Sequence, residues 1–440
     1  MTRDEFRITD DACLPLNFLY NYPMLNTYHL NHITDLIASI RPKLVNLRWD
    51  FAMFPELSGA EAHTAELIAW QLHNLGLDVT TGVGGHGVVG MLHGARPGPT
   101  VALRAELDAL PIQDARNVPY RSQLSGVMHA CGHDVHMAVA LGVAEVLTAL
   151  RDELPGAIKF IFQPAEESLA GARAMIAAGA LADPRPEAIF AWHVFPLPAG
   201  QVGYTPGCCL AGMEEFRITL RGAGDALASL AAEVCDVLGA LTTHAEPRDP
   251  AAIGETLRAM RSRGSALNEV LLLSCWPEAV DPAAPPAAFD EPGVEIRSML
   301  GLVSATGDAQ RRRARAAIAE TLARILNPAG VSYDLHFTFS NPATCNAPAL
   351  VCKAQPIIEA LVGTENAIAF QAPYAFSHED FALYQQEIPG ALFWLGAADP
   401  AQGIDAIWHT PTFDVGEAAL TVGTNVMTAI LFDALAHPPM

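Results

Sequence analysis

The chain has 440 residues, 51% of them hydrophobic and 17% charged, so it can bury a large core but is too long for one ordinary domain. Its net charge of −22 argues against nucleic acid or an anionic membrane as a partner, because phosphate binding needs a basic surface. No apolar signal segment opens the sequence, and no apolar run of about 18 residues occurs. We therefore expect two or three domains, a cytoplasmic location and no membrane span.

The cysteines are scattered without the spacing of a disulfide framework, which predicts reduced thiols. They are Cys13, Cys131, Cys208, Cys209, Cys235, Cys275, Cys345 and Cys352.

Residues 1–40 carry aromatic and turn-forming residues and predict an ordered N-terminal extension to which no function is assigned. Over residues 36–75 the apolar side chains recur at helical spacing. This predicts helices that are interrupted at Pro42 and Pro55, with Gly76 ending the last of them.

Three strand-like segments follow, at residues 77–80, 87–92 and 100–105. The third leads into Glu106 and Asp108. Two carboxylates at this spacing lie on one face of a strand, and the carboxyl ends of strands are where open α/β sheets hold their sites.

Residues 128–137 hold three histidines, one cysteine and one aspartate. The thiolate of Cys131 and the imidazole of His133 suit zinc or a similar divalent ion, and the apolar run 138–147 predicts a buried helix directly after them. Taken singly, these residues are more often core histidines and a buried free cysteine. Their clustering favours a metal site.

Two further strands end in polar residues. Residues 158–162 lead into Glu166 and Glu167, and residues 188–192 lead into His193. By itself the glutamate pair would be read as a solvated turn. Because three consecutive strands end in residues that can bind metal, we expect these side chains to meet at one edge of a sheet.

The pattern changes near residue 212 to alternating strands and amphipathic helices, which predicts a small α+β domain at residues 212–330 inserted between the two parts of a catalytic domain, 1–211 and 331–440. The segments are strands 216–221 and 294–299, helices 226–241 and 311–326, and a Pro/Ala-rich loop at 277–292. Beyond residue 348 a strand at 391–395 and a closing helix at 418–435 restore the α/β pattern.

Four motifs, in order, resemble those of one family. Arg104–Pro111 resembles RADMDALP, His129–His136 resembles HACGHDxH, Gln163–Glu167 matches QPAEE, and Trp408–Phe413 resembles HxPxF. The chain is thus identified, from about residue 48 onward, as similar to the amidohydrolase/aminoacylase branch of the dinuclear zinc metallopeptidases, which includes hippurate hydrolases and indole-acetyl-amino-acid hydrolases.

The resemblance implies two divalent ions (Zn, Mn, Co or Ni) with Cys131 as the bridging ligand and Glu166 as the general base. It further implies that Asp108, counted with Glu166 as catalytic, and Asp134 orient the ligands. The implied ligands are Cys131, His133, Glu167, His193 and His409.

The implied fold is a zinc-peptidase-like α/β catalytic domain with an inserted α+β lid that forms a homodimer. The implied reaction is hydrolysis of the amide bond of a small N-acyl amino acid or dipeptide-like substrate. Two alternatives stay open: a biosynthetic relative that forms amides or transfers acyl groups, and a metal-retaining binding protein without turnover.

Several positions depart from the family pattern. Glu106 replaces an aspartate, and His378 is an additional histidine beside Glu379; these three are candidate substrate contacts. For His378 the alternative, an ordinary loop histidine, is favoured. In the lid, an ungapped reading puts Ala226 where relatives carry a histidine, and no arginine occurs between residues 297 and 311. These changes predict weak hydrolysis of the family's ordinary substrates.

Overall fold

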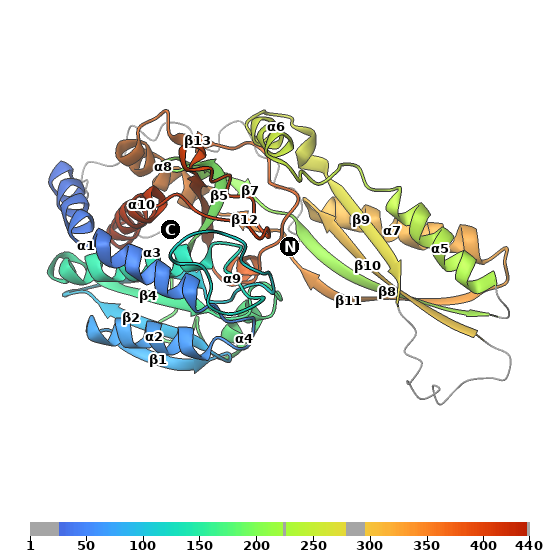
Figure 1. The fold of residues 1–440 in the computed structure, drawn as a ribbon, viewed down its shortest axis with the longest axis horizontal. Helices are drawn as coiled ribbons and strands as arrows, with labels where there is room; N and C mark the ends of the chain where they lie inside the picture. Colours follow the sequence, from blue (N-terminus) through green and yellow to red (C-terminus); the bar gives the residue numbers. More distant parts are fainter. Residues whose placement is uncertain (1–25, 223–225, 279–294, 438–440) are drawn as a thin grey trace.

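A computed structural model describes residues 26–222, 226–278 and 295–437. Most of the predicted N-terminal extension (residues 1–25) and most of the predicted Pro/Ala-rich loop (279–294) lie outside these ranges. The described chain forms a larger lobe around a central sheet and an elongated inserted lobe (Figure 1).

The central sheet of the larger lobe has eight strands, and its inner strands β4, β3, β5 and β14 run parallel to one another. This confirms the predicted α/β class. Across the sheet the order is β1 (Asp78–Val83), β2 (Gly87–His93), β4 (Pro155–Gln163), β3 (Arg96–Glu106), β5 (Ala188–Pro198), β14 (Gly390–Ala398), β6 (Val202–Tyr204) and β13 (Ala367–Ala369).

Helices cover both faces of this sheet. One face carries α1 (Thr27–Met53), α2 (Ala62–Asn74), α3 (His133–Ala149), α8 (Pro348–Val362) and α10 (Ala418–Ala436), and the other carries α4 (Gly171–Ala177) and α9 (Phe381–Glu387). The inner strands are apolar on both faces because side chains of a strand alternate between them. Leu103 of β3 belongs to the first core, and Ala102 belongs to the second.

The predicted break at Pro42 is wrong, since α1 continues through it. Proline removes one helical hydrogen bond, but Ile37, Leu44 and Phe51 of α1 are buried in the core and hold the helix in place. Gly76 ends α2 with φ of 74°, as predicted, and its N–H donates to the carbonyl oxygen of His73.

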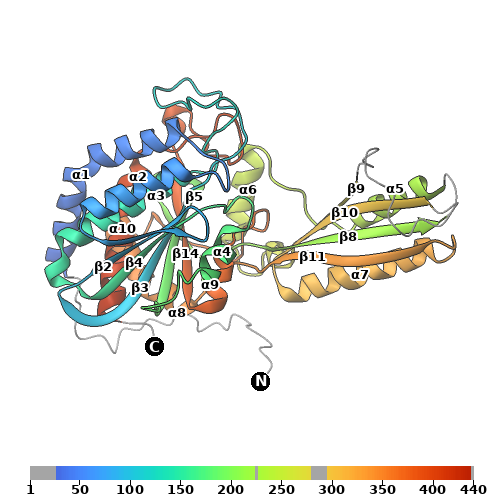
Figure 2. The same ribbon diagram turned by 90° about the horizontal axis from the view of Figure 1, so that it is seen from below.

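The inserted lobe is a four-stranded antiparallel sheet whose strands run outward from the larger lobe (Figure 2). The helices α5 and α7 pack on one of its faces, and α6 lies beside the larger lobe. Its elements are β8 (Gly212–Gly222), α5 (Ala226–Gly239), α6 (Pro250–Met260), β9 (Leu271–Pro277), β10 (Glu295–Ala305), α7 (Asp308–Leu326) and β11 (Ser332–Asn341).

The sequence analysis missed β9, α6 and β11. Because β11 pairs with β8 along its length, we propose residues 212–341, not 212–330, as the inserted unit. Short 3-10 helices lie at Arg151–Glu153, Ala266–Glu269 and Pro400–Gln402.

The two connections between the lobes lie side by side and are cross-linked. β7 (Gly207–Cys208) precedes the insert and pairs with β12 (Cys345–Asn346), which follows it, and a disulfide joins Cys208 to Cys345. The expectation of reduced cysteines is therefore wrong for this pair. Strand pairing brings together two residues that are 137 apart in sequence. The cysteines consequently no longer support a cytoplasmic location.

Within the described ranges one helix, α10, is long and apolar enough to cross a membrane. However, 72% of its most apolar window is buried inside the protein, where it packs against α1, α3 and α8. Burial in the core accounts for its composition.

Candidate metal centre and active site

The predicted ligands meet at one edge of the central sheet. Glu167 follows the carboxyl end of β4, and His193 lies within β5. Cys131 and His133 lie at the start of α3, and His409 comes from the loop that precedes α10. Since β3, β4 and β5 run parallel, their carboxyl ends deliver side chains to the same place.

Two sets of potential ligand atoms share the sulfur of Cys131. Cys131, His133 and His193 form one set, and Cys131, Glu167 and His409 form the other; within each set the ligand atoms lie within 4.8 Å of one another. The Sγ of Cys131 lies 3.5 Å from Nε2 of His193, and Nε2 of His409 lies 3.6 Å from Oε2 of Glu167. This is the arrangement expected of two ions bridged by a thiolate.

Two buried atoms at the centre of this cluster have no hydrogen-bond partner. They are Nε2 of His133 and Oε1 of Glu167, which lie 3.9 Å apart. A buried polar atom without a hydrogen-bond partner lowers the stability of the folded state by about 1–3 kcal/mol. Burial, together with the nearby carboxylates of Glu167 and Glu166, also raises the pKa of the Cys131 thiol well above its usual value. A divalent cation would satisfy both atoms and favour the thiolate, so these residues fit a metal pair.

The rings of the two buried histidines are held by backbone carbonyls. Nδ1 of His133 lies 2.8 Å from the carbonyl oxygen of Asp108, and Nδ1 of His193 lies 2.8 Å from that of Val194. Each Nε2 therefore faces the cluster. The Asp108 carboxylate accepts hydrogen bonds from the Ser58 hydroxyl (2.7 Å) and the Glu167 N–H (2.9 Å). Asp108 is buried, and its contacts with the His133 ring and the Glu167 backbone suit a positioning residue.

The expected role of Asp134 is not supported. Its carboxylate is bound by the buried guanidinium of Arg48 at 3.1 Å instead of orienting a ligand. Arg48 also binds Asp414 and the carbonyl oxygen of Val415, in the segment that follows His409. Arg48, which the sequence analysis did not select, therefore ties α1 to the segments that carry the ligands.

The backbone is constrained where it supplies site residues. Gly132 has φ of 87°, and a Cβ there would lie 2.4 Å from Cγ2 of Val194. Ala165, just before the glutamate pair, and His409 have φ of 53° and 58°, which are uncommon for residues other than glycine. Such conformations persist where the surrounding structure enforces them, often at functional sites.

Glu166 lies beside the ligands with its carboxylate 3.9 Å from Nε2 of His133. It is only 4% exposed but lines the cleft. Burial, followed by repulsion from Glu379 and Glu167, raises its pKa well above the usual value. A carboxylate in this setting can accept a proton and release it again.

Arg104 lies behind Glu166 and binds a group of buried carboxylates. The sequence did not predict that these residues lie close together. Arg104 is bound to Glu106, to Glu379 (2.8 Å) and to Asp380 (2.9 Å), and its Nε donates to Gln163 at 2.9 Å. Glu106 and Glu379 are at most 1% exposed. The prediction that these two contact substrate is therefore not supported, because both face Arg104 rather than the cleft.

A cleft of about 510 Å³ opens over the ligands. His378 lines it, and its Nε2 lies 2.8 Å from the Ser304 hydroxyl. The inserted sheet supplies Met213, Glu215 and Phe339, which sequence reasoning missed because nothing in the sequence shows which end of the insert faces the site. The remaining lining residues are Glu166, Glu167, Ser168, Leu169, Phe376, Ser377 and His409.

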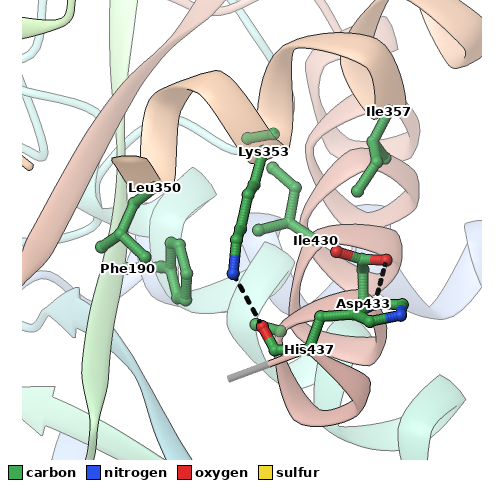
Figure 3. Close-up of a pocket in the computed structure, with 9 residues that line it drawn as sticks. Phe190, Leu350, Lys353, Ile357, Ile430, Asp433 and His437 are labelled. Carbon is green, nitrogen blue, oxygen red and sulfur yellow. Dashed lines mark hydrogen bonds and ion pairs between the residues drawn. The ribbon is translucent and has the colours of Figure 1, made fainter. Parts of the chain in front are cut away.

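The lid position predicted to lack a histidine lies elsewhere. Ala226 begins α5 beyond the outer end of β8, away from this chain's own ligands, and residues 223–225 before it lie outside the described ranges. A second hollow, between α8 and α10, measures only about 10 Å³ (Figure 3). It contains the contact between Lys353 and His437 and is too small for a substrate.

The fold and site together define the class: an α/β protein with a candidate metal site, in which two sets of potential ligands share Cys131, in a cleft next to the inserted lobe. The chain belongs to the Peptidase family M20/M25/M40, whose model matches residues 102–433.

Its relatives span nearly the whole chain. N-acetylcysteine deacetylase of Bacillus subtilis is 31% identical over 391 residues, covering 87% of this chain and 94% of that protein. IAA-amino acid hydrolase ILR1-like 5 of Arabidopsis thaliana is 30% identical over 412 residues, covering 90% and 88%. The crystal structure of Bacillus subtilis YXEP, described as a dinuclear metal binding peptidase of the M20 family, matches with a TM-score of 0.72 and 28% identity over 91% of this chain and 99% of that one.

These similarities confirm the resemblance, the fold class and a hydrolytic enzyme. The alternatives of amide formation and of binding without turnover are not favoured.

Proposed function

We propose that this protein is a metal-dependent amidohydrolase that cleaves the amide bond of a small N-acyl amino acid or dipeptide-like substrate. The observation that carries the proposal is the pair of ligand sets sharing Cys131, with buried Glu166 beside them in the cleft. The names of the relatives, a deacetylase of N-acetylcysteine and a hydrolase of IAA-amino acids, support this substrate class.

Cys131, His133, Glu167, His193 and His409 would hold two divalent ions. When bound, these ions supply Lewis-acid polarisation of the substrate carbonyl and lower the pKa of the attacking water. Glu166 takes a proton from that water as the oxygen adds to the carbonyl carbon. It then passes the proton to the amide nitrogen as the carbon–nitrogen bond breaks, leaving a carboxylic acid and an amine. Asp108 holds the His133 ring and the Glu167 backbone throughout.

Two variants test this function. Glu166→Gln should keep its metal and fold but lose at least ~10²-fold in kcat, the usual scale for general acid–base catalysis. Cys131→Ser should bind less metal in elemental analysis, which also identifies the native ion. Exposed Glu187, elsewhere in the larger lobe, provides the matched control Glu187→Gln, which should behave as wild type.

N-acetyl and N-benzoyl amino acids and dipeptides serve as substrates. Full activity in Glu166→Gln would show that another residue is the base. Absence of metal from the wild type after expression in metal-supplemented medium would contradict the proposal.

We further propose that the inserted unit pairs two chains into a homodimer, as the resemblance implies. Light scattering on the full chain at micromolar concentration should give twice the chain mass of 46.9 kDa. A monomer under these conditions would refute the pairing.

A further inference from the structure

The geometry points to Glu215 as a specificity residue that selects amide substrates carrying a cationic group, an ammonium or a guanidinium. This inference rests on the proposed hydrolysis and names the kind of substrate that the same cleft takes. Three features of the cleft carry it: an unpartnered carboxylate, the absence of a compensating cation, and an apolar wall.

The two adjacent glutamates at the start of β8 differ in their surroundings. Glu214 points to the face covered by α7, where both of its carboxylate oxygens accept hydrogen bonds from Arg315, at 2.7 and 2.9 Å. Glu215 points to the opposite face, as does Met213, and both line the cleft. Glu215 is half-buried, and no described residue forms a hydrogen bond or ion pair with it. Its charge is therefore available to a ligand.

The cleft offers nothing positive of its own to balance this charge. Among the described residues that line it are three glutamates, Glu166, Glu167 and Glu215, and neither a lysine nor an arginine. Burial lowers the pKa of His378 to about 4, so this imidazole is neutral near pH 7. Arg217, two residues further along the same face of β8, is bound to Glu278 at 2.8 Å. Metal ions would neutralise the ligand cluster, but Glu215 lies on the inserted lobe and is not a ligand.

The wall around Glu215 suits a cation on an aliphatic chain. Phe339 of β11 pairs directly with Glu215, and Met213, Phe376 and Leu169 complete an apolar lining. Lysine-like and arginine-like groups bury their methylene stems against such surfaces while the charged end reaches a carboxylate. A free carboxylate placed here would instead be repelled by Glu215.

Matched substrate pairs test the inference. At the amine end, N-acetyl-L-arginine is compared with its neutral near-isostere N-acetyl-L-citrulline; at the acyl end, 6-aminohexanoyl-glycine is compared with hexanoyl-glycine. Wild type should prefer the cationic member of at least one pair about tenfold in kcat/KM, mainly through KM. Glu215→Gln should abolish that preference by lowering kcat/KM for the cationic member toward the value for the neutral one. Glu320→Gln, an exposed glutamate on α7 outside the cleft, should keep it.

Calorimetric binding of the same compounds to the metal-loaded Glu166→Gln protein separates this inference from the proposed reaction. Suppose that none of the compounds is hydrolysed, but the cationic member binds more tightly and loses this advantage when Glu215 is replaced by Gln. The proposed hydrolysis of these amides is then contradicted, and the inference about Glu215 holds. Equal binding and turnover within both pairs would overturn the inference and leave the reaction intact. A change of oligomeric state in Glu215→Gln without any change in selectivity would also overturn it, because Glu215 would then belong to a contact between chains.

Discussion

Replacing Arg104 tests whether the buried charges behind the site behave as one unit. The guanidinium is fully buried and serves three carboxylates, Glu106, Glu379 and Asp380. Removing one partner of a single buried pair costs about 3–5 kcal/mol, because the other charge is left without compensation. Since Arg104 compensates three carboxylates, we expect Arg104→Ala to lower the free energy of unfolding by about 5 kcal/mol, the upper end of this range.

The exposed pair Arg185–Glu387 provides the matched control. Its side chains are 56% and 47% exposed, and such pairs contribute about 0.2–1 kcal/mol. We take the free energy of unfolding to fall by about 3 kcal/mol for each 1 M of urea. Arg104→Ala should then lower the urea concentration at the unfolding midpoint by more than ~1.5 M, and Arg185→Ala should lower it by less than ~0.4 M.

The urea midpoint of Arg104→Lys should lie between those of Arg104→Ala and Arg185→Ala, because a single ammonium cannot reach all three carboxylates. This variant also serves if Arg104→Ala does not fold. Circular dichroism in urea, with metal content held constant, measures all three. Equal midpoints for Arg104→Ala and Arg185→Ala would refute the argument that one buried cation holds this group together.

Two further substitutions test the constraints on the site and on the connection between the lobes. Gly132→Ala should lower the free energy of unfolding by about 2–4 kcal/mol, because alanine is strained at this positive φ and its Cβ would collide with Val194. Thermal unfolding measures this loss, and metal content is followed in the same samples. Gly239→Ala, where an added Cβ meets nothing within 4 Å, should be neutral or slightly stabilising, and an equal loss in both would contradict the steric argument. A non-reduced digest should contain the Cys208–Cys345 peptide pair, and Cys208→Ser should lower the urea midpoint by an amount equivalent to about 2–4 kcal/mol. Two unlinked peptides in that digest would show that the bridge does not form in solution.

The sequence determined the class of the protein, because the strand pattern and the motifs are local, and through the resemblance it predicted a ligand set. The strands around residues 101–105, 158–162 and 188–192 are apolar apart from Arg104 and Lys159, and such runs are typical of parallel strands buried on both faces. The clustering of Cys131 with His133 raised the hypothesis of metal binding, and the motif resemblance supplied the remaining ligands. Strands β3 and β4 lie close to their predicted bounds, whereas α3 begins at His133 rather than at residue 138, and β5 continues to Pro198 instead of ending before His193.

The tertiary structure decided what depends on contacts between distant segments. Whether Glu106 and Glu379 face substrate or Arg104, and whether Cys208 meets Cys345, follows from packing across the sheet and between the lobes. The same holds for Pro42, whose effect on α1 is outweighed by burial of that helix.

The adjacent glutamates of β8 show this limit most clearly. Glu214 and Glu215 are chemically identical in the sequence, and the alternation of a strand says only that they point to opposite faces. The position of α7 on one face and of the cleft on the other makes the first an ion-paired residue and leaves the second without a partner. Residue type and spacing thus fixed which groups could take part in the chemistry, whereas long-range packing fixed which of them reach the cleft.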